Sequence, residues 1–155
     1  MNGQSEQALR GAQVWGTHEH TVDSKGRVSI PSDFRAELNF SEGAELYVTR
    51  HLSERCLLVF WPEAWDAFVA GIGERSESPE IASTVRRVVC GYRRRVKLDR
   101  LGRIQVPHEQ RKYSELEGKC FVMGQGGHME IWSMPVWEAT HGPDAYADVG
   151  FGRFL

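Results

Sequence analysis

Apolar and polar residues alternate in two short runs that lie far apart in the chain. Val28 and Ile30 alternate with polar residues in the first run, and Ile104 and Val106 do so in the second. This pattern is typical of a strand with one buried face. A proline directly follows each run, where it can end the strand and open a helix. We therefore expect a short strand and then a short helix at both places.

The same motif, Asp-x-x-Gly-Arg, precedes both runs. It occupies residues 23–27 and 99–103, which are 76 residues apart, and Arg35 and Arg111 lie four residues after the two prolines. A repeat has to be recognised first, because it determines how every other element is assigned. We interpret the chain as two copies of one small β-rich unit.

Further strands and helices follow in the same order in both copies. The expected strands are residues 15–22, 46–49 and 57–60 in the first copy, then 93–98, 121–123 and 129–132 in the second. A helix is expected after each last strand, beginning at Pro62 and at Pro135. In the first of these helices, Trp65, Phe68 and Val69 are expected to be buried.

A helix is predicted between the two copies, with Ser78 as its cap and Pro79 at its first position. Apolar residues then recur at helical spacing: Ile81, Val85, Val88, Val89 and Tyr92. Such a stripe favours a surface that faces the core, with an interface as the alternative.

The residues of the repeated motif suit a tight turn. Gly26 and Gly102 can adopt a positive φ, and Asp23 and Asp99 can accept backbone N–H groups and hold the turn. An ordinary structural turn, copied by duplication, explains the same residues.

The arginine that ends each motif, Arg27 or Arg103, lies where the turn becomes a strand. We expect both to point outward with their five N–H donors available.

Charge is distributed very unevenly along the 155 residues, although the net charge is only −2. Residues 86–103 hold eight basic residues and one acidic residue, a net +7 that leaves −9 for the remainder. The basic residues are Arg86, Arg87, Arg93, Arg94, Arg95, Lys97, Arg100 and Arg103. A basic stripe on an acidic body suggests a surface that binds a polyanion. On the strand, Arg94 is expected to be half-buried and paired with an acid.

The composition, 41% hydrophobic and 26% charged, is that of a soluble globular protein. The sequence shows no apolar run long enough for a membrane span, and because its start is polar we expect no signal peptide. Cys56, Cys90 and Cys120 fit neither a disulfide framework nor a metal knuckle, so we expect reduced thiols in the cytosol.

Catalytic and metal-binding patterns are weak. His18 and His20 share one face of a predicted strand, but no third ligand falls at a known spacing. His51 near Cys56 is interpreted as an incidental pair at a turn. We expect no enzyme activity, metal, cofactor or small-molecule substrate.

These motifs resemble the MraZ family of bacterial proteins, relatives of the AbrB-like DNA-binding folds. The resemblance rests on residues 16–27 with Pro31 and Arg35, and on residues 99–103 with Pro107 and Arg111. It extends over about residues 15–139.

The resemblance implies an α+β fold in which two tandem AbrB-like βαβ-type repeats form a small swapped-hairpin β-barrel with flanking helices. The domains expected are a disordered extension at 1–14, a first repeat at 15–77, a linking helix at 78–91, a second repeat at 92–140 and a flexible tail at 141–155.

The resemblance also implies a ring-forming, sequence-specific regulator of the division and cell-wall gene cluster, cytoplasmic and associated with the nucleoid. Its partners would be other copies of itself and double-stranded DNA carrying short promoter repeats. Carried over from the family, Lys25, Arg27 and Arg103 would contact DNA. The basic segment adds Arg93, Arg95, Lys97 and Arg100 as candidates.

This chain departs from the family pattern at two positions of the second copy. Leu101 stands where the first motif has Lys25, and Gln110 stands where the first copy has Phe34. The second turn is therefore expected to contribute less to binding, and the second helix to pack differently. The alternative function is a ring-forming structural or antitoxin-like module that binds protein.

Overall fold

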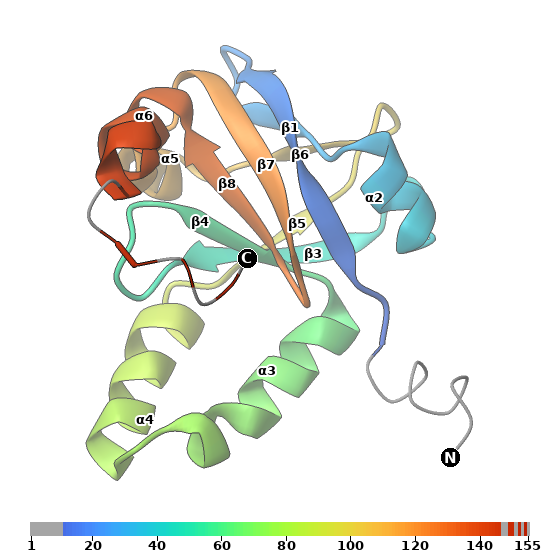
Figure 1. Ribbon diagram of the computed structural model, residues 1–155. Coiled ribbons are helices and arrows are strands. Elements are labelled where there is room, and N and C mark those ends of the chain that lie inside the picture. Colours follow the sequence, from blue (N-terminus) through green and yellow to red (C-terminus); the bar gives the residue numbers. More distant parts are fainter. Residues whose placement is uncertain (1–10, 147–148, 151, 153, 155) are drawn as a thin grey trace.

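The computed structural model describes residues 11–146, 149, 150, 152 and 154, in which strands and helices alternate along the chain (Figure 1). Most of the predicted N-terminal extension, residues 1–10, lies outside this range, as do residues 147, 148, 151, 153 and 155 of the predicted tail. The first strand begins at Val14, one residue earlier than expected, because that side chain is buried with only 2% of its surface exposed.

The first copy of the repeat forms six elements. They are β1 (Val14–Val22), β2 (Arg27–Ser29), α2 (Ser32–Glu37), β3 (Glu45–Arg50), β4 (Leu57–Phe60) and α3 (Pro62–Arg75). These bounds confirm the strands and helices predicted for this half of the chain.

The second copy and its connection form the remaining elements. They are α4 (Pro79–Val85), the π-helical turn η1 (Arg86–Cys90), β5 (Arg94–Lys97), β6 (Arg103–Gln105), α5 (His108–Ser114), β7 (Gly118–Gly126), β8 (Met129–Ser133), α6 (Met134–His141) and the 3₁₀ turn η2 (Pro143–Tyr146). The predicted cap of α4 is confirmed, since Ser78 Oγ accepts a hydrogen bond from the N–H of Ile81 at 3.2 Å.

The strands pair antiparallel in two sheets, and most pairs join one copy to the other. The large sheet has the order β1-β7-β8-β4-β3-β5, and β2 pairs with β6 in a separate ribbon. In the large sheet, β1, β3 and β4 of the first copy correspond to β5, β7 and β8 of the second. When each strand is exchanged for its counterpart, the order of the sheet is reversed but the same strands remain neighbours. The fold therefore has internal two-fold pseudosymmetry, in which the first strand of each copy pairs with the third strand of the other.

Alternate residues of the large sheet face two different apolar layers. Leu57 and Val59 join a core that also holds Val28 and Ile104 of the ribbon, so this core lies between the sheet and the ribbon. Phe60 faces the other way, towards α3. The predicted α+β class is confirmed, whereas closure into a swapped-hairpin barrel stays a prediction.

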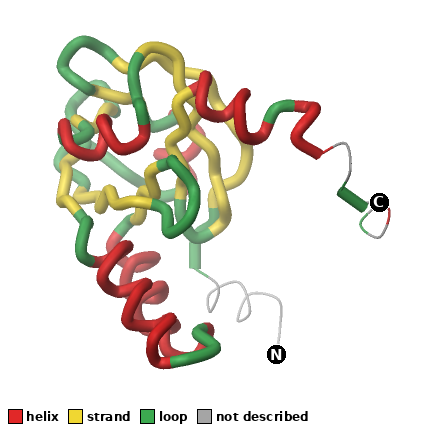
Figure 2. Tube along the Cα trace, turned by 90° about the vertical axis from the view of Figure 1, so that its left-hand side faces the viewer, coloured by secondary structure: helices red, strands yellow, loops and turns green. Residues whose placement is uncertain are grey.

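Helices α3 and α4 form a pair that projects away from the sheet (Figures 1 and 2). The expectation that the apolar residues of these helices and of the stripe that continues to Tyr92 are all buried is wrong for Val69, Ile81 and Tyr92, which are 39%, 43% and 41% exposed. Trp65 and Val89 are buried as predicted. The reason is that a projecting pair of helices has the sheet on only one side.

No helix of the described residues is long and apolar enough to cross a membrane.

Candidate nucleic-acid interface

The two Asp-x-x-Gly-Arg turns have the same hydrogen-bond geometry. In the first turn, Asp23 Oδ1 accepts the backbone N–H groups of Lys25 and Arg27, each at 2.9 Å. In the second turn, Asp99 Oδ1 accepts those of Leu101 and Arg103 at the same distances. Each aspartate thus holds its turn as the sequence predicts, because one carboxylate oxygen accepts the N–H groups two and four residues ahead.

The arginine at the end of each turn is less free than the sequence suggests. Arg27 Nε lies 2.6 Å from Asp23 Oδ2, and Arg103 Nε lies 2.9 Å from Asp99 Oδ2. The two side chains are only 33% and 26% exposed. The expectation of five available donors is therefore wrong, since Nε of each arginine already binds the aspartate of its own turn. The Nη groups make no bond to the aspartate of their own turn, although Nη1 of Arg103 lies 4.0 Å from Asp23 Oδ2 of the other turn.

The glycine of each turn makes room for an arginine of the opposite copy. A Cβ atom at Gly26, where φ is +78°, would lie 2.5 Å from the guanidinium carbon of Arg111. At Gly102, where φ is +79°, it would lie 2.5 Å from that of Arg35. Glycine is therefore favoured here by the positive φ, and a Cβ atom would in addition force the guanidinium of the arginine to move.

Arg35 and Arg111, whose role the sequence does not reveal, pack against the glycines of the two turns. Arg35 Nε donates to Ile30 O and Arg111 Nε donates to Val106 O, each at 3.0 Å. Each arginine therefore ties its own helix to its own strand while its guanidinium covers the glycine of the other turn.

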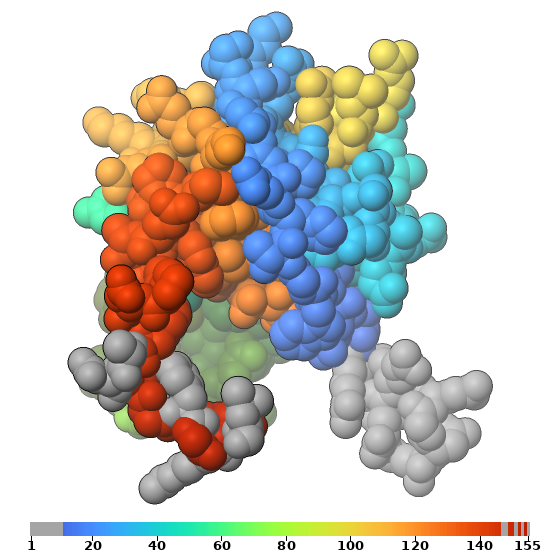
Figure 3. All heavy atoms as spheres, turned by 45° about the horizontal axis from the view of Figure 1, so that its top comes forward, coloured from blue at the N-terminus to red at the C-terminus, as the bar shows by residue number. Residues whose placement is uncertain are grey.

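The β2–β6 ribbon locks the two turns together. Val28 is the register partner of Ile104, and the ladder continues as Ile30 N–H donates to Gly102 O at 2.9 Å. Because the ribbon is antiparallel, the turns lie at its opposite ends, yet both project from the same end of the molecule, upward in Figure 1. Figure 3 shows them as separate projections, blue for the first copy and yellow for the second.

The tips of the turns are open to solvent. Lys25, Arg100 and Leu101 are exposed, and the described residues give Lys25 and Arg100 no acidic partner within ion-pair distance. A cation without an acidic partner is available to an anion from outside.

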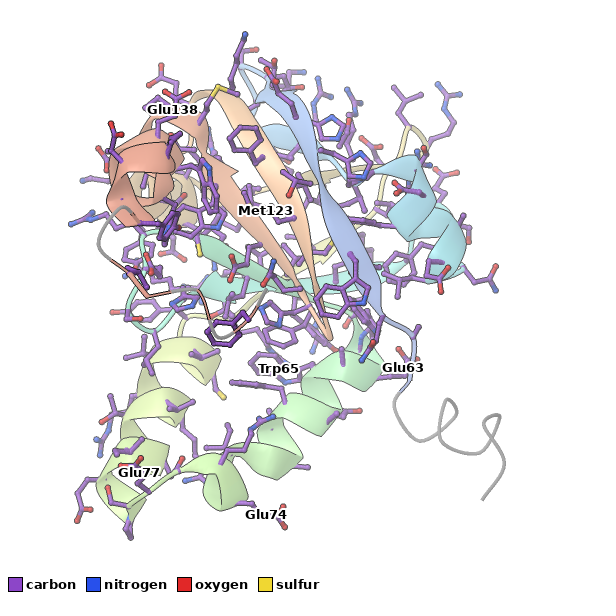
Figure 4. All side chains as sticks on the ribbon, in the orientation of Figure 1. Glu63, Trp65, Glu74, Glu77, Met123 and Glu138 are labelled. Atoms are coloured by element: carbon purple, nitrogen blue, oxygen red, sulfur yellow. The ribbon has the colours of Figure 1, made fainter. Side chains whose placement is uncertain are left out.

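The other basic candidates do not gather at the turns. Arg93 precedes β5, and its guanidinium carbon lies 4.3 Å from the ring centre of Tyr47 and 5.2 Å from that of Trp65. Trp65 belongs to α3, and Figure 4 places it below the sheet and away from the turns. Arg95 pairs with Glu45 at 3.2 Å, and Lys97 is exposed on the edge strand.

Arg94 pairs with an acid, as predicted. Its Nη2 lies 2.6 Å from Glu109 Oε1, which connects β5 to α5. The side chain is 44% exposed at the edge of the sheet, which is close to the expected half-burial.

Hydrogen bonding stabilises the charged form of both turn aspartates. The pKa of Asp23 lies below its usual value, chiefly because the carboxylate accepts the backbone N–H of Arg27. Burial raises the pKa of Asp99, but the hydrogen bonds from Arg103 and Leu101 outweigh it, and this pKa also lies below the usual value.

Three histidines and one cysteine are the candidates that the sequence offers for metal binding or catalysis. His18 Nε2 is 3.2 Å from Asp33 Oδ2, and burial lowers the pKa of His20. His51 Nδ1 accepts the N–H groups of residues 53 and 54, and burial raises the pKa of the Cys56 thiol. In the described part of the chain, no three His, Cys, Asp or Glu side chains form a group that could hold a metal ion.

Comparison with known proteins gives one consistent result. Residues 14–88 and 93–145 match the model of the family described as "MraZ protein, putative antitoxin-like". A protein of Saccharophagus degradans named Transcriptional regulator MraZ is 32% identical over 81% of this chain and 85% of its own length. A protein with that name from Legionella pneumophila is 30% identical over 80% of this chain and 82% of its own length. Another, from Acidithiobacillus ferrooxidans, is 32% identical over 87% of this chain and 95% of its own length.

Proposed function

The chain belongs to the MraZ family, and on that premise we propose that it is a transcriptional regulator that binds duplex DNA through its two Asp-x-x-Gly-Arg turns. One observation carries the proposal: both turns project from the same end of the molecule with their cations Lys25 and Arg100 exposed. The relatives' name adds the biological role, transcriptional regulation.

The dimensions of the ribbon suit a DNA groove. Gly26 and Gly102 are separated along the ribbon by four residues, since Gly102 bonds to Ile30, which gives about 13 Å at the usual rise of a strand. The major groove is about 12 Å wide, and two-stranded ribbons are known to enter it. Both turns can therefore reach one groove or the phosphates that border it.

The chemistry of the turns divides into two roles. Lys25 and Arg100, at the exposed tips, suit phosphate oxygens. Arg27 and Arg103 are held by their aspartates, so their Nη groups are pre-oriented for a guanine edge. Lys97 extends the basic surface along the edge strand, whereas Arg95 on the same strand is already paired with Glu45.

We extend the proposal to assembly and target. The ribbon and the large sheet share one core and are connected through the two turns, which supports closure into a swapped-hairpin barrel. One subunit contacts only a few base pairs, too few for a unique genomic site. A ring of identical subunits on repeated promoter sites of the division and cell-wall genes, within the nucleoid, supplies the missing specificity through multivalency.

The test is a mobility shift with DNA from upstream of the protein's own gene. If the basic side chains neutralise several phosphates, a plot of log affinity against log salt concentration is expected to have a slope of about −4 to −8. Arg27→Ala removes a contact worth about 1–3 kcal/mol and weakens binding more than Arg103→Ala, whose turn lacks the lysine. Arg75→Ala, an exposed arginine at the end of α3, is the matched control and leaves binding unchanged.

Binding that fails at low salt, or a slope near zero, would refute the DNA-binding function. The family description then favours the second candidate, an antitoxin-like module whose partner is a protein. The ring is tested separately with probes that carry repeats about 10 base pairs apart or offset by half a helical turn. Equal affinity for both probes contradicts multivalent binding by a ring.

A further inference from the structure

The two turns have the same backbone geometry but carry different side chains at their tips. Leu101 lies 76 residues after Lys25, and each donates its backbone N–H to the turn aspartate at 2.9 Å. The two side chains therefore leave equivalent points of the pseudosymmetric ribbon. When both turns lie against DNA, Lys25 and Leu101 therefore face equivalent positions on it.

Leu101 contributes little to folding. Its side chain is 61% exposed, whereas the neighbouring apolar residue of the same segment, Ile104, is completely buried. It lies between Arg100 and Arg103, at a turn that projects from the end of the molecule. When the two flanking cations hold the turn against DNA, the apolar side chain between them can contact a base.

DNA offers such a group one specific partner in the major groove. The C5 methyl group of thymine is the only apolar substituent on a base edge there, and apolar side chains read it. On the basis of the proposed function, we propose that Leu101 reads a thymine methyl group while Lys25 contacts a phosphate or a guanine. Each subunit then reads an asymmetric site, although its fold is nearly two-fold symmetric.

The experiment replaces single thymines by deoxyuridine, which removes the methyl group and nothing else. A footprint of the wild-type protein on the DNA upstream of its own gene first defines the protected segment. Synthetic duplexes with one substitution each are then titrated. Burial of one methyl group predicts about a fourfold loss of affinity at one thymine per bound subunit.

Variants assign that loss to Leu101. Leu101→Ala lowers affinity for thymine DNA by a similar factor and removes the uracil penalty, because the contact is already lost. Leu101→Lys also removes the penalty and steepens the salt slope by about one unit, since it adds a phosphate contact. Leu52→Ala, a leucine that is 45% exposed elsewhere, keeps the full penalty.

Two results overturn the inference while leaving the proposed function intact. One is wild-type binding that tolerates every uracil substitution. The other is a uracil penalty that persists in Leu101→Ala. A wild-type protein that shifts no DNA at low salt fails the proposed function itself, so the two failures are distinguishable.

Discussion

At the scale of single residues, the glycine of each turn is coupled to an arginine from the other half of the chain. Gly26 leaves space that the guanidinium of Arg111 fills at 2.5 Å from the missing Cβ. Gly43 also has a positive φ, +85°, but nothing lies within 4 Å of its missing Cβ. The two glycines thus separate the cost of backbone conformation from the cost of lost space.

Gly26→Ala is expected to destabilise the protein more than Gly43→Ala. Both substitutions incur about 1–2 kcal/mol for a side chain at positive φ. Gly26→Ala also displaces Arg111 and its hydrogen bond to Val106 O, which adds about 1–3 kcal/mol. Urea unfolding measures both values. If the second effect comes from Arg111, it disappears when Gly26→Ala is made in an Arg111→Ala background; equal costs for the two glycines contradict the coupling.

The turn aspartates give stability a defined dependence on pH. Their pKa values are lower in the folded than in the unfolded protein, so their contribution is complete above the unfolded pKa of about 4 and is lost as pH falls through the folded values. Asn at both positions keeps the shape but removes the charge. The double variant Asp23→Asn with Asp99→Asn is expected to be less stable than wild type at pH 6, and the difference narrows as pH is lowered to about 3.

Chemical unfolding at several pH values checks this expectation. Because other carboxylates titrate in both proteins, the difference between the two curves is the relevant quantity. A difference that stays constant with pH would mean that the two carboxylates do not stabilise their turns through charge.

Residue types alone predicted the turn itself. Asp-x-x-Gly has a local explanation, since an aspartate binds N–H groups two and four residues ahead. The partner of each glycine could not be predicted in this way. Residues 26 and 111 become neighbours only through strand exchange, and one sequence contains no signal for that pairing.

At the scale of elements, the two short helices α2 and α5 are attached differently to the sheet. Phe34 of α2 is buried in the apolar core. Its counterpart Gln110 is also buried, but its Nε2 donates to Val48 O and to Tyr92 O, each at 2.8 Å. The predicted difference in packing is confirmed: Gln110 supplies hydrogen bonds to the backbone near the point where β5 begins.

Gln110→Ala is expected to lower the free energy of unfolding by about 2–4 kcal/mol. The substitution removes two hydrogen bonds, of which the one to Val48 O is buried. Gln105→Ala is the matched control, because Gln105 is exposed although its Nε2 also donates to a backbone carbonyl, Lys25 O at 2.9 Å. Thermal and urea unfolding measure both. A small loss at Gln110, equal to that at Gln105, contradicts a structural role for the buried amide.

Element types and bounds were largely predictable, because periodicity is local. The alternation at Val28 and Ile30 and the prolines that follow strands act over a few residues. Exposure was harder to predict. Ile81 and Tyr92 lie on an apolar stripe, yet how far a helical pair projects from the sheet depends on contacts that the stripe does not encode.

At the scale of the whole molecule, neither copy of the repeat has its own sheet. β1 pairs with β7, β3 with β5 and β2 with β6, so each of these ladders joins the two halves. An isolated half retains one hairpin and loses most of its strand partners, and two-stranded hairpins are barely stable in water.

Fragments 1–77 and 78–155 are therefore expected to be unfolded separately and to fold when mixed in equal amounts. Circular dichroism of each fragment and of the mixture measures this, with the intact chain as reference. The division falls between α3 and α4, where no strand is interrupted. A fragment that folds cooperatively when alone would show that the halves are independent domains.

The strand exchange also has a consequence during translation. β1 ends at Val22 and its partner β7 begins at Gly118, so about 5–20 s of synthesis separate them at usual rates of translation. Throughout that interval β1 has no partner strand, and its backbone groups are open to pairing with other nascent chains. Its sequence Trp-Gly-Thr-His-Glu-His-Thr between two buried valines is mostly polar. We therefore expect the unpaired β1 to aggregate little before β7 is synthesised, because its mostly polar sequence offers other chains little apolar surface.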